Sequence, residues 1–108
     1  MARDYTAREA HSKWAAGEVV IIDVREQREH DQTRIDGVPL IPMSELLERI
    51  DELPTEAELV FICRSGSRSA RVADHVNAQG EHGDAVNLEG GIIAWAAEGL
   101  PYEGEPPS

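Results

Sequence analysis

The stretch LVFICRSGSRS, residues 59–69, joins four consecutive apolar residues to a polar segment that holds the only cysteine of the 108-residue chain. The apolar run is typical of a strand buried on both faces, as in a parallel sheet. After the polar segment, Val72, Ala73 and Val76 follow helical spacing, and Gly80 comes next as a stop signal. The stretch therefore predicts a strand, a loop and a helix in direct succession.

The same alternation continues on both sides of this stretch. Further strands are predicted at Val19–Ile22, Gly37–Ile41 (with Pro39 favouring a sheet edge) and Ala85–Leu88. Further helices are predicted from the capping box Thr6–Glu9 to Gly17, from Ser44 to Pro54, and from Gly90 to Gly99. This order predicts one α/β domain over residues 1–102, with a central, mostly parallel sheet of about five strands and helices on both faces. Residues 103–108 have nothing to bury, so we expect a disordered tail.

Composition limits the classes of partner. The chain carries a formal net charge of −11 from 21 acidic and 10 basic residues. This charge repels nucleic acid and anionic membrane surfaces, so we expect neither as a partner. A single cysteine excludes an internal disulfide, and no apolar run approaches the roughly 20 residues of a membrane span. Residues 1–18 also lack the apolar core of a signal peptide, so we expect a cytoplasmic protein.

The cysteine lies in a local cationic segment of this acidic chain, because three arginines and no carboxylate fall between Leu59 and Ala73. Cys63 follows a predicted strand and precedes a helix, where loop amides and the helix N-terminus favour an anion. Gly66 permits the required backbone torsions, and Arg64 and Arg68 add charge. Hydroxyl donors are available from Ser65, Ser67 and Ser69. A lone cysteine is more often a small buried apolar residue, but these polar neighbours favour a reactive thiolate.

The histidines do not suggest a metal site. His11, His30, His75 and His82 show no ligand spacing with one another or with Cys63. No motif places a histidine beside the cysteine, although the sequence alone leaves a cysteine–histidine dyad open. We therefore predict no metal and no cofactor.

Three motifs, in this order along the chain, resemble the rhodanese-homology family of sulfurtransferases in its single-domain form. Residues 21–26, IIDVRE, are similar to one family signature, and residues 63–69 match its C-R-x-G-x-R-S loop. Residues 88–101 are similar to a third signature, L-E-G-G-x-x-A-W followed by G-L-P. The chain departs from the family pattern at His30, where an aromatic is usual, and over residues 33–38.

The resemblance implies a three-layer fold and a persulfide mechanism. Cys63 would attack the outer sulfur of a small anionic donor such as thiosulfate and pass that sulfur to cyanide or a thiol. Loop amides from Arg64 to Arg68 would hold the charge of the persulfide, and a sulfur-accepting protein could be the final partner. Asp23 and Arg25 are interpreted as a structural charge pair that ties the sheet to a neighbouring loop.

Two other functions remain open at this point. Phosphatases and arsenate reductases with a cysteine–arginine loop place five residues between the two, whereas four separate Cys63 from Arg68. The shorter loop favours sulfur over a phosphoryl group. A non-catalytic partner-binding module is the other alternative, but such relatives typically lose the cysteine. The physiological donor and acceptor, a role in relay or as a stand-alone enzyme, and the oligomeric state stay undetermined.

Overall fold

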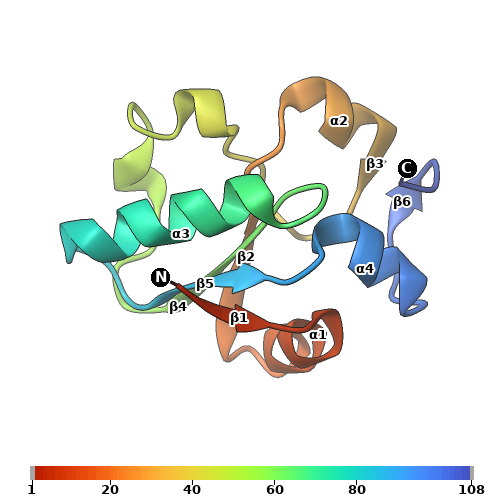
Figure 1. Ribbon diagram of the computed structural model, residues 1–108, viewed down its shortest axis with the longest axis horizontal. Helices are drawn as coiled ribbons and strands as arrows, with labels where there is room; N and C mark the ends of the chain where they lie inside the picture. Colours follow the sequence, from red (N-terminus) through yellow and green to blue (C-terminus); the bar gives the residue numbers. More distant parts are fainter. Residues whose placement is uncertain (1, 108) are drawn as a thin grey trace.

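The computed structural model describes residues 2–107 and confirms the α/β class (Figure 1). Its main sheet is wholly parallel, in the order β1-β5-β4-β2. The strands are β1 (Arg3–Tyr5), β2 (Val19–Asp23), β4 (Glu58–Ile62) and β5 (Ala85–Leu88). The predicted strand at residues 37–41 contributes only a bridge between Leu40 and Asp23, which lies at the β2 edge of the sheet. The sheet therefore has four strands and one bridge, where about five strands were predicted.

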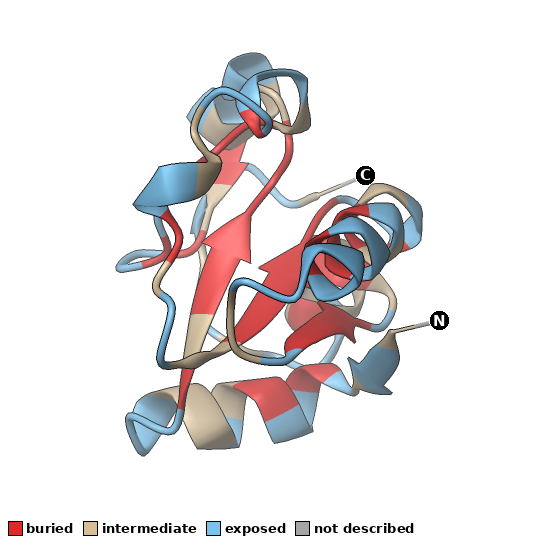
Figure 2. Cartoon of the chain, turned by 90° about the vertical axis from the view of Figure 1, so that its left-hand side faces the viewer, coloured by how far each residue is buried: buried red, intermediate tan, exposed pale blue. Residues whose placement is uncertain are grey.

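Helices cover both faces of this sheet. Alternate residues of each strand point to opposite faces, and apolar side chains on each face pack against helices. On one face α1 (Ala7–Ala15) and α4 (Gly91–Ala97) pack against a cluster that includes Ile21 and Val60. On the other face α3 (Ser67–Gln79) packs against Ile22 and Phe61. Figure 2 shows the strands buried between helices whose outer surfaces are exposed.

The segment after β2 differs from the sequence prediction. A short helix, α2 (Gln27–Gln32), follows the strand, and the predicted helix from Ser44 to Pro54 is wrong. Two 3₁₀ turns, η1 (Met43–Glu45) and η2 (Ile50–Glu52), take its place. The Ser44 hydroxyl does not cap a helix, since it donates to Glu26 Oε1 at 2.7 Å. The apolar stripe is also broken, because Leu46 is buried whereas Leu47 is 69% exposed.

The C-terminal segment is ordered by a second, two-stranded sheet. β6 (Glu103–Gly104) pairs antiparallel with β3 (Thr33–Arg34), and the Glu105 amide donates to the Gln32 carbonyl at 2.7 Å. Gly104 has φ +91°, and a Cβ at this position would lie 2.2 Å from the Gln32 oxygen, so only glycine fits. The expectation of an unpaired tail from residue 103 therefore does not hold for Glu103–Glu105.

Candidate active site

Cys63 lies directly after β4, at the carboxyl edge of the sheet where ligands of open α/β folds bind. Its side chain is fully buried. The loop that begins at Cys63 rests on the start of α4, because the amides of Ile92 and Ile93 donate to the carbonyls of Cys63 and Arg64 at 2.9 and 3.3 Å. Gly66 ends the loop with φ +102°, the left-handed torsion expected from the sequence. Two helices thus fix the loop.

Neutral donors surround the Cys63 sulfur. Sγ lies 3.1 Å from the amide nitrogen of Gly66, 3.4 Å from that of Ser69, and 3.2 Å from the Ser69 hydroxyl. Burial alone raises the pKa of the thiol, but these donors and the Ser65 amide outweigh that effect, so the net pKa is lowered. The loop therefore favours a buried thiolate, which is the nucleophilic form of cysteine.

The Ser69 hydroxyl belongs to a chain of hydrogen bonds that reaches the first strand. Besides contacting Sγ, it donates to Asn87 Oδ1 at 2.6 Å, and the Asn87 amide nitrogen donates to Asp4 Oδ1 at 2.9 Å. A carboxylate only accepts, so Asp4 fixes which end of the Asn87 amide faces Ser69. Because the hydroxyl has one hydrogen, Asn87 Oδ1 and Sγ share it.

The positive charge of the Arg68 side chain is paired with a carboxylate of another element. Its guanidinium makes two hydrogen bonds of 2.8 Å to the carboxylate oxygens of Glu29, which comes from α2. Hydrogen bonding to Arg68 lowers the pKa of Glu29 from 4.5 to about 2, against the opposing effect of partial burial. The charge that Arg68 adds to the cationic patch expected from the local sequence is therefore balanced by a carboxylate from a distant segment.

The structural charge pair expected at the end of β2 is present. Arg25 Nη2 lies 2.8 Å from Asp23 Oδ2, with both side chains less than 5% exposed. Arg25 also donates to the backbone carbonyls of Glu29 and Thr33. It thereby ties the edge of the sheet to α2 and β3, the elements that form one side of the site.

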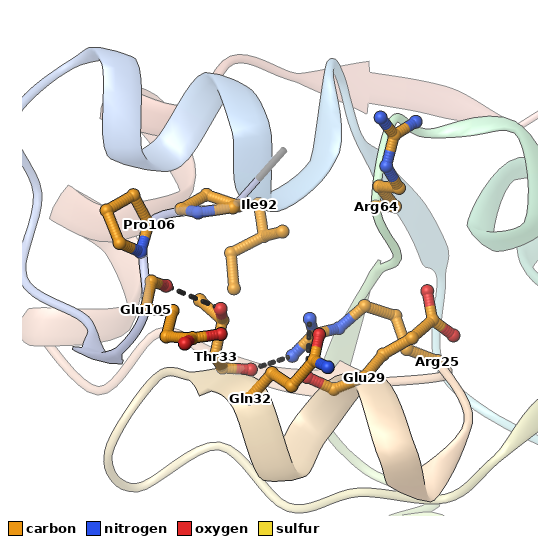
Figure 3. A pocket seen from close by; sticks show the side chains of 9 residues that line it. Arg25, Glu29, Gln32, Thr33, Arg64, Ile92, Glu105 and Pro106 are labelled. Carbon is orange, nitrogen blue, oxygen red and sulfur yellow. Dashed lines mark hydrogen bonds between the residues drawn. The ribbon is translucent and has the colours of Figure 1, made fainter.

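Of the remaining predicted loop residues, Ser65 contributes its backbone amide to the contacts of the Cys63 sulfur. The side chains of Arg64, Ser65 and Ser67 are exposed. In Figure 3 the Arg64 guanidinium points away from Arg25 and Glu29. Ser69, which the sequence offered as a hydroxyl donor, contacts Sγ, whereas the predicted site residues did not include Asn87, Asp4 and Glu29. Only Ser69 carried a local signal, as the last residue of the loop motif, whereas the other three reach the site through tertiary contacts.

A pocket of about 100 Å³ lies beside the loop (Figure 3). Arg64 and Ile92, which flank the Cys63 backbone, form one side of it. Arg25, Glu29 and Thr33 line another side. Gln32 and the C-terminal residues Glu105, Pro106 and Pro107 complete the lining. Arg64, the residue that follows Cys63, thus places this pocket next to the loop.

Residues 2–107 contain neither a membrane-spanning helix nor a cluster of metal ligands. No helix in this range has the length and apolar character needed to cross a membrane. Within the same range, no group of three or more histidine, cysteine, aspartate or glutamate side chains is arranged to hold a metal ion.

Comparisons with known proteins agree on one family. The model of the rhodanese-like domain matches residues 6–98. A sulfurtransferase of Allochromatium vinosum is 39% identical over 84 residues, which cover 78% of each chain. YtwF of Bacillus subtilis is 40% identical over 78% of this chain and 80% of its own. The crystal structure of a rhodanese-related protein from Thermoplasma volcanium superposes with a TM-score of 0.85 at 31% identity, covering 95% of this chain and 99% of that one. The chain belongs to the rhodanese-like domain family.

Proposed function

We propose that this protein is a sulfurtransferase that carries a sulfane sulfur as a persulfide on Cys63. The observation that carries the proposal is the set of three donor contacts to Sγ, at 3.1 to 3.4 Å, from Gly66 and Ser69. Donors fixed before the reaction stabilise a negative sulfur without reorganisation. The names of the relatives support the same class of reaction.

The reaction consists of two displacements at sulfur. With thiosulfate as donor, the Cys63 thiolate attacks the outer sulfur, the S–S bond of thiosulfate breaks, and sulfite leaves with the electron pair. The new persulfide keeps one negative charge, which the loop amides can hold. Cyanide or a thiolate then attacks the terminal sulfur, and the bond to Cys63 breaks to restore the thiolate.

The contacts of Arg68 favour sulfur transfer over phosphate chemistry. A phosphatase with a cysteine–arginine loop needs its arginine to bind the oxyanion of the substrate. Here both terminal nitrogens of the Arg68 guanidinium donate to Glu29 at 2.8 Å. Binding a phosphoryl group through Arg68 would require breaking this pair, whereas the amides around Sγ need no such change.

The test is intact-mass measurement after incubation with thiosulfate, with Cys63→Ser measured alongside. We expect the native protein to gain one sulfur atom and the variant to gain none. Cyanide should then remove that sulfur as thiocyanate. If Cys63→Ser gains sulfur equally, or if the native protein gains none from thiosulfate, a thiosulfonate or an alkyl persulfide, the proposed function is wrong.

A further inference from the structure

The pocket beside the Cys63 loop has a wall that the family pattern does not include. The family match ends at residue 98, whereas Glu105 and Pro106 line the pocket. Pairing of β6 with β3 holds this wall in place, as do the hydrogen bond from the Glu105 amide to Gln32 and that from the Thr33 hydroxyl to the Glu105 carbonyl. Figure 3 shows the Glu105 side chain beside Thr33. The C-terminal segment is thus a built part of this site.

The charges around the pocket do not favour a highly charged anion. Arg25 is paired with Asp23, and Glu29 is paired with Arg68. The Arg64 guanidinium points away from this polar side of the pocket (Figure 3). Within residues 2–107, no cation lies within ion-pair distance of the Glu105 carboxylate. Glu105 therefore adds a negative charge that no ion pair among residues 2–107 offsets, on a chain whose net charge is already −11.

We propose that this pocket next to the Cys63 loop binds the sulfur donor. We further propose that the Glu105 carboxylate makes the pocket select singly charged or neutral donors over dianionic ones. The inference rests on the proposed function and refines its substrate class. Thiosulfate carries two negative charges, whereas a thiosulfonate or an alkyl persulfide carries one. Repulsion by a fixed carboxylate grows in proportion to the charge of the ligand.

This proportionality gives a quantitative expectation. If removing the Glu105 charge accelerates the reaction with a monoanion about threefold at low salt, it accelerates the reaction with a dianion by about the square of that factor, roughly ninefold. A neutral reagent should not respond. Because the pocket is open to solvent, the effect should decrease as the salt concentration rises.

The first experiment measures the alkylation of Cys63 and does not require sulfur transfer. Iodoacetate and iodoacetamide carry one negative charge and none, so the ratio of their rates cancels any change in thiol reactivity. Glu105→Gln should raise this ratio about threefold at low salt. Glu103→Gln is the matched control: it removes the same charge from the same C-terminal segment, but Glu103 does not line this pocket, and its carboxylate lies 3.7 Å from the Arg34 guanidinium. An unchanged ratio in Glu105→Gln, or an equal rise in both variants, would overturn the inference.

The second experiment compares two sulfur donors. Rates of persulfide formation from thiosulfate and from methanethiosulfonate, which releases methanesulfinate, are measured for the native protein and for Glu105→Gln. The gain with thiosulfate should be about the square of the gain with methanethiosulfonate. Equal gains would overturn the charge selection. If no donor forms a persulfide, the proposed function fails, while the alkylation ratio still decides whether Glu105 controls the pocket.

Discussion

The two sides of the Cys63 loop use different chemistry. On the inner side, amide and hydroxyl dipoles from Gly66 and Ser69 contact the sulfur. On the outer side, Arg25 and Arg68 bind carboxylates and backbone carbonyls. Neutral dipoles thus stabilise the thiolate, whereas the charged pairs hold the elements around it in place. Each of three substitutions tests this division.

The largest expected effect on stability comes from Asp23→Asn. The change leaves the buried Arg25 guanidinium without its carboxylate, which should cost about 3–5 kcal/mol of unfolding free energy. Urea denaturation measures this loss. Asp31→Asn, at an exposed position of α2, serves as the control and should change stability by about 0.5 kcal/mol or less. A loss below about 1 kcal/mol in Asp23→Asn would show that the outer side does not depend on this pair.

Ser69→Ala tests the inner side. Losing a preorganised donor to the sulfur should slow persulfide formation by on the order of 10²-fold. The pH profile of Cys63 alkylation should also move to higher pH, because the hydroxyl favours the charged form. Ser67→Ala is informative beside it, since this exposed neighbour makes no described contact with Sγ through its hydroxyl. Equal pH profiles for Ser69→Ala and the native protein would assign the lowered pKa to the amides alone.

The smallest effect is expected at the partly exposed pair, through Arg68→Gln. The folded-state pKa of Glu29, about 2, lies below its ordinary value of 4.5. Its stabilisation is therefore present above pH 4.5 and is lost as the pH falls towards 2. We expect Arg68→Gln to cost about 1–2 kcal/mol at neutral pH, a figure reduced for solvent screening, and less in acid. Urea denaturation across this pH range would contradict the assignment if the penalty stayed constant.

Most of the fold could be predicted from hydrophobic runs and helix signals. Thr6 and Glu9 form the predicted capping box, and α3 ends at Gly80 as expected. The predicted Ser44 helix failed because its serine instead bonds to Glu26, a tertiary contact without a local signal. The pairing of Thr33 with Gly104 was also missed, since two-residue polar strands have no periodicity to detect.

The candidate site was predictable where its residues are contiguous. Cys63 and the amides that follow it lie together as expected, and Asp23 pairs with Arg25. Glu29 and Asn87 could not be found in this way, because each becomes part of the site only when α2 and β5 pack beside the loop. A prediction based only on the sequence neighbours of Arg68 therefore overestimates the positive electrostatic potential at the Cys63 sulfur.

The hydrogen-bond chain from Asp4 through Asn87 to Ser69 has a consequence for how the protein matures during translation. β5 lies between β4 and β1, so β1 has no partner strand in this sheet until residues 85–88 have left the ribosome. A nascent chain that already contains the Cys63 loop still lacks the amide that orients the Ser69 hydroxyl. The complete set of contacts around the thiol therefore forms only when nearly the whole domain has been synthesised.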